Sequence, residues 1–120
     1  WLGAGGTNFL SKPLAAYIMN MKSRVTQAGA KCPHIPTLAK TADVICTEMF
    51  KKHAITADMV KDGVIIIDNG NNYEGKKVFG DVDPAVYEKA SAYTPVPGGT
   101  GPMLIAMLLR NTVKAATKIA

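Results

Sequence analysis

Cysteine is scarce in this sequence, which contains only Cys32 and Cys46 among 120 residues. The two do not form a close motif, and two cysteines are too few for a disulfide framework or a zinc site. This shortage excludes the disulfide-stapled scaffolds of small secreted domains and favours a reducing compartment. We therefore expect a cytoplasmic or mitochondrial location and no bound metal.

Long hydrophobic runs are missing as well. The two longest are Val64–Asp68 and Met103–Leu109, and both fall far short of the roughly 20 apolar residues that a helix needs to cross a bilayer. The sequence therefore predicts no membrane span. Both runs are typical of buried core elements.

Aromatic residues make up only 7% of the chain and do not interleave with the basic residues. The net charge of +5 is compatible with an anionic partner, but the lysines and arginines are scattered along the chain. Single-strand binders place aromatic rings between their basic residues, so we expect no nucleic-acid partner. The two histidines, His34 and His53, lack the spacing of a catalytic triad or a metal site.

The composition, with 48% hydrophobic and 19% charged residues, is that of one globular domain. The chain opens on Trp1 with no initiator methionine, so we expect it to begin inside a longer or processed polypeptide. Strand-like runs alternate with helical patterns, which indicates an α/β fold with a parallel sheet. Strands are expected at 1–4, 24–28, 43–47, 64–68 and 93–96, and helices at 13–22, 37–42, 56–63, from 84 onward and at 102–118.

A glycine-rich stretch, "GAGGTN" at 3–8, lies between the first expected strand and the first expected helix. A phosphate loop of a dinucleotide-binding fold occupies this place, and an ordinary tight turn fits the same residues. The second strand ends in "QAGAK" with no acid to hold a ribose. Lys31 can instead meet a 2′-phosphate, which would favour NADP, or be plain surface charge.

Three aspartates follow or precede expected elements. Asp68 ends a buried strand, where it can hold a ligand or cap the following turn. Asp81 and Asp83 are expected to organise a turn and a helix start. Thr56 is expected to be the N-cap of the helix at 56–63, which would stop at Gly63.

The stretch "TPVPGGTGPM" at 94–103 combines three prolines with three glycines directly before the last expected helix. Prolines fix φ, whereas glycines permit a close backbone approach. From the residues alone, a ligand-binding turn and a shaped connection remain equally open.

Together with "GDVD" at 80–83, the stretch "TPVPGGTGPMLIAMLLRNTVKAA" at 94–116 resembles the C-terminal signature of the bifunctional methylenetetrahydrofolate dehydrogenase/methenyltetrahydrofolate cyclohydrolase family. The family pattern is T-P-V-P-G-G-V-G-P-M-T, from which Thr100 and Leu104 depart. "GTNFLSKPLA" at 6–15 resembles the family's G-R-S-x-x-V-G-x-P loop, and "KTADV" at 40–44 its Q-A-D-I stretch. "ITADMVKDGVIIIDNGNN" at 55–72 is similar to its V-K-x-x-W-V-K-x-G-A-V-V-I-D-V-G-I-N.

The resemblance implies that residues 1–120 form the family's NAD(P)-binding domain, a Rossmann-like doubly wound parallel sheet with helices on both faces. It implies oxidation of 5,10-methylenetetrahydrofolate with NADP and hydrolysis of the methenyl product, a tetrahydrofolate derivative as partner, and a homodimer or a larger complex. The implied cofactor-binding residues are Gly5, Gly6, Thr7, Asn8, Lys31 and Gly70, and the implied substrate-binding residues are Pro97, Gly98 and Gly99. The family's catalytic residues belong to an N-terminal domain, so no catalytic residue is expected here.

Several departures from the family patterns cluster on the cofactor side. The Arg of G-R-S corresponds to Gly6, the later glycine of that loop to Ser11, H-S-R after the second strand to "GAK" at 29–31, and A-V-G after the third strand to "EMF" at 48–50. These changes motivate an alternative hypothesis, an inactive relative that serves as a structural subunit of a larger complex.

Overall fold

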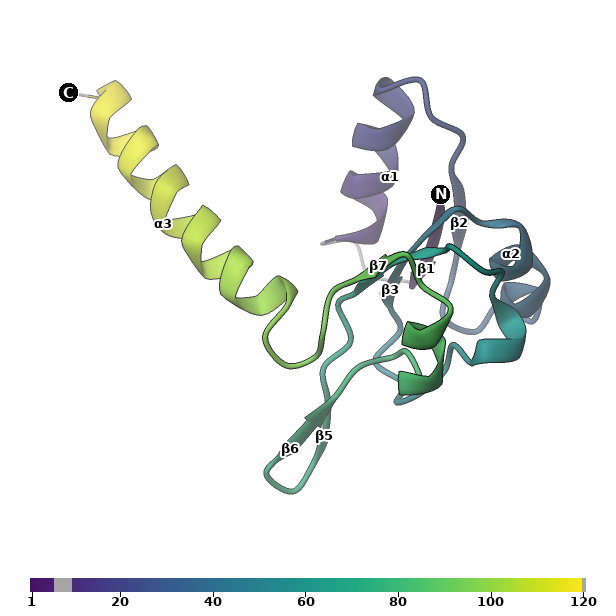
Figure 1. The fold of residues 1–120 in the computed structure, drawn as a ribbon. Helices are drawn as coiled ribbons and strands as arrows, with labels where there is room; N and C mark the ends of the chain where they lie inside the picture. The colour runs from purple at the N-terminus through teal and green to yellow at the C-terminus, as the bar shows by residue number, and fades with distance from the viewer. Residues whose placement is uncertain (6–9, 120) are drawn as a thin grey trace.

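A five-stranded parallel sheet forms the centre of the protein. The computed structural model describes residues 1–5 and 10–119. The strands follow the spatial order β2-β1-β3-β4-β7 (Figure 1). They span Leu2–Gly5 (β1), Thr26–Ala28 (β2), Val44–Glu48 (β3), Ile65–Asp68 (β4) and Ala92–Tyr93 (β7). The chain leaves β1 to one side and then returns to the other, which is the doubly wound topology that the sequence predicts.

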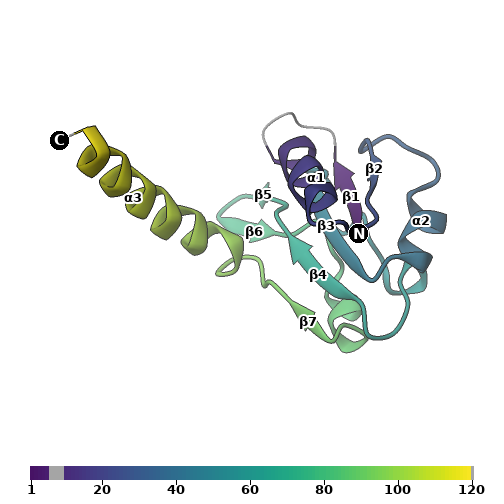
Figure 2. The ribbon, with the colours of Figure 1, turned by 90° about the horizontal axis from the view of Figure 1, so that it is seen from above.

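Helices cover both faces of the sheet, as expected. Helix α1 (Ser11–Asn20) packs on the face that carries Gly3 and Cys46. Alternate strand residues point to opposite faces, and the other face bears Leu2 and Ile45, which pack into the main core with α2 (Ile35–Thr41). Viewed from above, the strands lie side by side between these layers (Figure 2).

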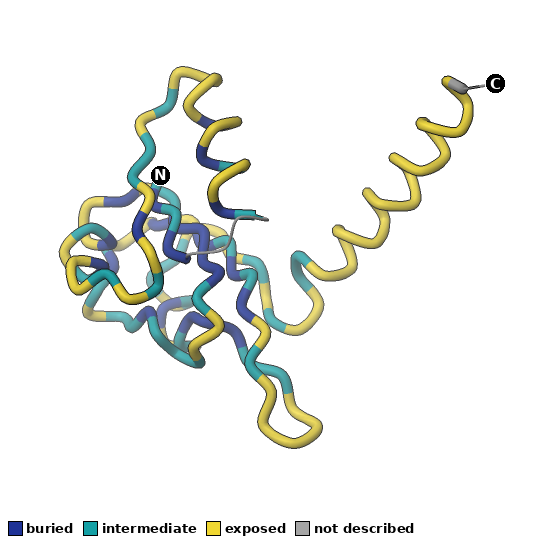
Figure 3. Tube along the Cα trace, turned by 180° about the vertical axis from the view of Figure 1, so that it is seen from behind, coloured by how far each residue is buried: buried dark blue, intermediate teal, exposed yellow. Residues whose placement is uncertain are grey.

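The main core is built from aliphatic side chains of the strands and of the crossover segments. Burial of each valine, leucine or isoleucine contributes about 1.5–3 kcal/mol. Figure 3 shows this buried region gathered at the sheet. Its members less than 2% exposed are Leu2, Ala4, Ala39, Ile45, Ile55, Val64, Ile66, Val82 and Val86.

Two predicted helices are shorter than the sequence suggested. The helix expected at 56–63 is a single 3-10 turn, η1 (Ala57–Met59). The turn ends because Val60 adopts an extended backbone, and the ammonium group of Lys89 donates to the carbonyl oxygens of Ala57 and Val60, at 3.2 and 3.0 Å. Thr56 does not cap this turn, contrary to the prediction; its hydroxyl donates to the Asp58 carboxylate instead.

The helix expected after Asp83 is also a 3-10 segment, η2 (Pro84–Glu88). Asp83 caps it as predicted, accepting a bond from the Ala85 amide at 2.9 Å. Other boundaries also shift, since β2 begins at Thr26, α2 spans 35–41 and the last strand is confined to Ala92–Tyr93.

An antiparallel hairpin projects from the body of the sheet (Figure 1). It consists of β5 (Asn72–Glu74) and β6 (Lys77–Phe79). Gly75, with φ of +61°, turns the chain between them. The sequence predicts only turn residues and a short run here, so the hairpin is a finding of the structure.

The last helix, α3 (Thr100–Ile119), runs away from the sheet and is exposed over residues 101–118 (Figures 1 and 3). The prediction that Met103–Leu109 is a buried core element is therefore wrong for this chain: Leu104 is 67% exposed and Leu109 64%. The other apolar run is buried in part, since Val64 and Ile66 are covered and Ile65 is not. Within 1–5 and 10–119, no helix is long and apolar enough to cross a membrane.

Candidate functional site at the carboxyl edge of the sheet

The carboxyl ends of the parallel strands bring together five stretches that are far apart in the sequence. These are Gly5, the turn after β2, the residues after β3, the residues after β4, and the turn between β7 and α3. In doubly wound folds, ligands bind at this edge, beside the point where the strand order reverses. Gly6, Thr7 and Asn8 of the expected phosphate loop lie outside the described residues.

Gly5 ends β1 where β1 and β3 approach each other closely. A Cβ atom on Gly5 would lie 2.6 Å from the carbonyl oxygen of Glu48, so no other residue fits without a backbone shift. The carbonyl of Gly5 accepts a bond of 3.0 Å from the side-chain amide of Gln27 on β2. The chain is thus held tightly where it enters the expected phosphate loop.

Lys31 and Gly70 lie at the same edge in different settings. Lys31 is exposed in the turn after β2, which is closed by a bond of 2.8 Å from the Cys32 amide to the Gly29 carbonyl. Gly70 is buried, and a Cβ on it would lie 2.5 Å from the Asp81 carboxyl group. Gly70 therefore serves the packing of this edge, and a contact between either residue and a cofactor stays a prediction.

The turn 94–99 has the close backbone geometry that its prolines and glycines suggest. Gly98 has φ of +103°, and a Cβ on Gly99 would lie 2.4 Å from the Pro95 carbonyl oxygen. The Val96–Pro97 peptide bond is cis. The turn shapes the backbone beside the end of β4, and a role for Pro97, Gly98 and Gly99 toward a substrate stays a prediction.

Asp68 is fully buried and organises the polypeptide around it. Its carboxylate accepts bonds from the backbone amides of Gly70, Asp81 and Val82, at 2.8, 3.1 and 3.0 Å, and from the Thr47 hydroxyl at 3.1 Å. Burial raises the pKa of the Asp68 carboxyl, against these three amides, which favour the ionised form. Of the two roles left open by the sequence, the structure assigns Asp68 the structural one.

Asp81 does the same for the loop after β3. Its carboxylate accepts bonds from the backbone amides of Met49 and Lys51 and, at 3.0 Å, from the Asn72 side chain. Phe50 lies between the two bound amides, and its φ of +53° is in the left-handed region. Its side chain is largely exposed, with 54% of the residue accessible to solvent. The left-handed conformation costs roughly 1–2 kcal/mol for a residue with a Cβ, and little burial of the ring offsets this cost.

Aromatic and charged contacts join this loop to the hairpin. The Lys52 ammonium lies 3.7 Å from the centre of the Phe79 ring and 2.6 Å from the Glu74 carboxylate. His53 meets the edge of the Phe79 ring and places Nδ1 3.6 Å from the Asp83 carboxylate. His53 thus has a structural setting, and the described residues contain no group of side chains that could hold a metal ion.

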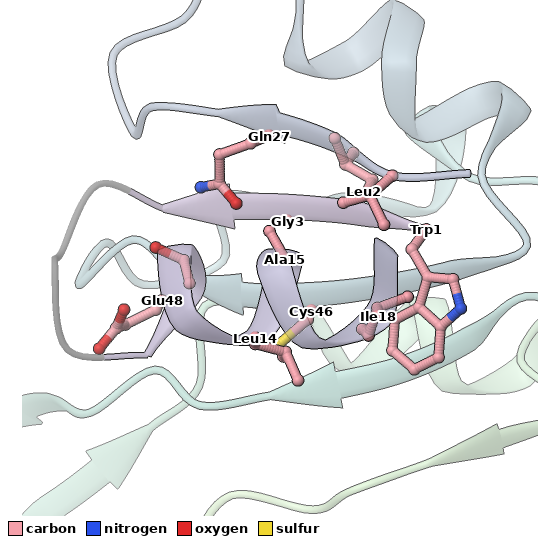
Figure 4. Close-up of a pocket in the computed structure, with 11 residues that line it drawn as sticks. Trp1, Leu2, Gly3, Leu14, Ala15, Ile18, Gln27, Cys46 and Glu48 are labelled. Carbon is pink, nitrogen blue, oxygen red and sulfur yellow. The ribbon is translucent and has the colours of Figure 1, made fainter. Parts of the chain in front are cut away.

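A small hollow lies between α1 and the sheet (Figure 4). Trp1, Leu14, Ile18 and Cys46 form its apolar wall, with Glu48 toward the carboxyl end of β3. Its free space of about 10 Å³ gives room for no more than one water molecule. Burial raises the pKa of the Cys46 thiol to about 11, so this cysteine is a protonated packing residue. A larger hollow of about 520 Å³ lies at the opposite edge, beside Arg24 and Asp43.

Two side chains at the carboxyl edge escaped the sequence analysis. The hydroxyl of Thr100, at the start of α3, donates to the Oδ1 atom of Asn69, directly after β4, at 2.7 Å. The position of Asn69 after a buried strand was the available signal, although nothing in the sequence pairs it with a residue 31 positions later.

Comparison with known proteins identifies the family to which this chain belongs. The family described as tetrahydrofolate dehydrogenase/cyclohydrolase, NAD(P)-binding domain, matches residues 4–120. The chain belongs to this family. Its NAD(P)-binding role and its Rossmann-like fold agree with the predictions made from the sequence.

Similar proteins of the tetrahydrofolate dehydrogenase/cyclohydrolase family are more than twice as long as this chain. The "Bifunctional protein FolD" of Nitratiruptor is 48% identical over 113 residues, which are 93% of this chain and 40% of that protein. The FolD crystal structure from Campylobacter jejuni has a TM-score of 0.93 and 40% identity, over 99% of this chain and 43% of that one. The chain thus spans about two fifths of the relatives it matches.

A third relative bears on the cofactor. The Trypanosoma brucei methylenetetrahydrofolate dehydrogenase-cyclohydrolase, solved with NADP cofactor and an inhibitor, has a TM-score of 0.87 and 26% identity, over 93% of this chain and 41% of that one. These matches support NADP as the cofactor class. They lend no support to the alternative hypothesis of an inactive structural relative.

The network around Asp68 leads to a first prediction. Asp68→Asn keeps the shape of the side chain but replaces one of its two acceptor oxygens by an NH2 group. In either orientation this NH2 group faces a backbone N–H, that of Val82 or that of Gly70, and one hydrogen bond is lost. We expect it to lower the free energy of unfolding by about 1–3 kcal/mol, measured by urea titration. Asp83→Asn, which keeps the helix cap, should cost less than about 1 kcal/mol; equal losses in both variants would contradict the assignment.

The backbone of Phe50 leads to a second prediction. Phe50→Gly removes the left-handed strain and should raise the free energy of unfolding by about 0.5–1 kcal/mol, after allowance for the greater freedom of glycine in the unfolded chain. Phe50→Ala removes the same ring but keeps the strain, and should stay within about 0.5 kcal/mol of the parent. If alanine stabilises as much as glycine, the ring and not the backbone is the source of the strain.

Proposed function

We propose that this chain binds NADP along its carboxyl edge as part of an enzyme that oxidises 5,10-methylenetetrahydrofolate and hydrolyses the methenyl product. The observation that carries the proposal is the close approach of Gly5 to Glu48, which leaves the start of the expected phosphate loop without a side chain at the strand-order reversal. Glycines at this point let a diphosphate reach the backbone amides of a helix start. Family membership supports the reaction class.

The chain's own residues would bind and orient the cofactor, and NADP would supply the hydride acceptor. Gly5 and the loop that follows would hold the diphosphate, with Gly6, Thr7 and Asn8 as the next contacts. Lys31, exposed beyond β2, would pair with the 2′-phosphate. Gly70 would act through the packing of the edge, and the turn at Pro97, Gly98 and Gly99 would face the tetrahydrofolate derivative. The acid and base residues of the reaction would come from the part of the relatives that this chain does not span.

Calorimetry with NADP and NAD tests this binding site. Lys31→Gln should weaken NADP binding about tenfold, since a hydrogen bond to a charged group contributes about 1.5–3 kcal/mol, and should leave NAD binding unchanged. Lys76→Gln, at the exposed hairpin turn, is the matched control and should change neither. Absence of heat with either dinucleotide at millimolar concentration would refute the proposed function.

The apolar surface of α3 fits the same proposal. Leu104, Leu108 and Leu109 are all more than half exposed. Arg110 and Lys114, four residues apart, share one side of the helix, and they project away from Leu108 because residues two and six positions apart point to different sides of an α-helix. Because the relatives are much longer than this chain, we propose that the leucine side packs against the portion of the polypeptide that is found in the relatives and not here. A cytoplasmic or mitochondrial location and a homodimer or larger complex stay predictions.

This packing can be measured in the intact protein. Leu108→Glu should lower its free energy of unfolding by about 2 kcal/mol or more, since it would place a charge where a leucine is covered. Lys114→Glu, on the charged side of α3, should change it by less than about 0.5 kcal/mol. Equal effects of the two substitutions would show that both sides of α3 face solvent.

A further inference from the structure

Asn69 and Thr100 form a polar pair at two positions where the family patterns have valine. The pattern D-V-G-I-N aligns its second residue with Asn69, and T-P-V-P-G-G-V-G-P aligns its last valine with Thr100. In this chain the Thr100 hydroxyl donates to Asn69 Oδ1 at 2.7 Å. Where the pattern has two apolar side chains, this chain has a hydrogen-bonded pair.

The pair fixes the direction of the Asn69 carboxamide. The backbone amide of Asn69 donates to the Thr47 carbonyl of β3 at 3.1 Å, which anchors the residue at its main chain. Its Oδ1 atom is held by Thr100, so the Nδ2 group points away from the start of α3. Among residues 1–5 and 10–119, the Nδ2 group of Asn69 has no hydrogen-bond acceptor, and the Asn69 side chain is only partly buried. Two oriented N–H donors are therefore available to a ligand.

The strand order indicates which part of a dinucleotide reaches these donors. Along the carboxyl edge the order is β2, β1, β3, β4. Lys31 follows β2 and Gly5 ends β1, so the adenosine half and the diphosphate lie over these two strands. The other half of the dinucleotide then extends across β3 to β4, where Asn69 lies. That half ends in the nicotinamide ring, whose carboxamide oxygen is a hydrogen-bond acceptor.

We propose that Thr100 orients Asn69 so that its Nδ2 group donates to the carboxamide oxygen of the nicotinamide ring of NADP. The inference rests on the proposed function, because it assumes that the dinucleotide binds at this edge. Asn69 is the residue in contact with the cofactor, and Thr100 is a positioning residue. The Asn69–Thr100 pair would thus recognise the carboxamide oxygen of the nicotinamide and fix the orientation of the ring at the carboxyl edge.

A double-mutant cycle in the intact protein tests the proposal with two ligands. NADP carries the nicotinamide ring, whereas 2′,5′-ADP carries only the adenosine half with its phosphates. Asn69→Val should weaken NADP binding about tenfold and leave 2′,5′-ADP binding unchanged. Thr100→Val should weaken NADP binding in the same direction, Thr100→Ser should restore it, and the double valine variant should bind no more weakly than Asn69→Val. Asn71→Val, an exposed asparagine in the same loop, is the control and should bind both ligands like the parent.

A second readout separates contact from mere structural support. The thionicotinamide analogue of NADP replaces the carboxamide oxygen by sulfur, which is a weaker acceptor. The parent should bind NADP more tightly than this analogue, and Asn69→Val should lose the preference.

Three outcomes would overturn the inference and leave the proposed function intact. Equal weakening of NADP and 2′,5′-ADP would make the pair a structural feature only. If Asn69→Val still bound NADP more tightly than the thionicotinamide analogue, the nicotinamide ring would lie elsewhere. The same conclusion would follow if Asn69→Val bound the folate substrate more weakly and NADP as tightly as the parent. If the parent binds neither NADP nor 2′,5′-ADP, the proposed function fails as well, and the two failures are thereby distinguished.

Discussion

The buried carboxylate of Asp68 is the interaction on which the carboxyl edge depends. It gathers amides from the turn after β4 and from the segment at 81–82, together with the hydroxyl of Thr47 on β3. Asp81, positioned by that bond, in turn holds the amides of Met49 and Lys51. A buried carboxylate is tolerated only because so many donors converge on it. The loops after β3 and β4 are therefore fixed as one unit before any ligand arrives, which lowers the entropy cost of binding.

Close backbone approach is the second constraint at this edge. The carbonyl of Glu48 faces Gly5 and the carboxyl group of Asp81 faces Gly70, each at a distance that a Cβ would not permit. These glycines let the strand ends and loops lie nearly in contact. The Asn69–Thr100 pair, which departs from the family patterns, lies where side chains fit, whereas Phe50 keeps a left-handed backbone that would suit glycine. The backbone frame of the family is thus retained while the chemistry along it differs.

The sequence was informative where a local pattern decides the structure. The apolar runs of β3 and β4, the proline and cap at the start of η2, and the strand-glycine-helix order around Gly5 each depend on nearby residues. The helix predicted at 56–63 was wrong, because Val60 turns to an extended backbone and its carbonyl oxygen binds the ammonium group of Lys89, 29 residues away. The apolar pattern of α3 predicted that the helix has a side to bury, but periodicity cannot say what covers it. Likewise, the ligand and structural roles of Asp68 could be separated only by its donors, two of which lie 13 and 14 residues away.

The exit of α3 from the sheet has a geometric consequence. Thr100 is both the first residue of this helix and the partner of Asn69. At 1.5 Å per residue, the 20 residues of α3 form a rod about 30 Å long, so a tilt of roughly 5° at its first turn displaces the far end by about 3 Å. Because α3 begins at the carboxyl edge, a small change in direction at Thr100 would be enlarged, at the far end of the helix, to a displacement on the scale of a side chain.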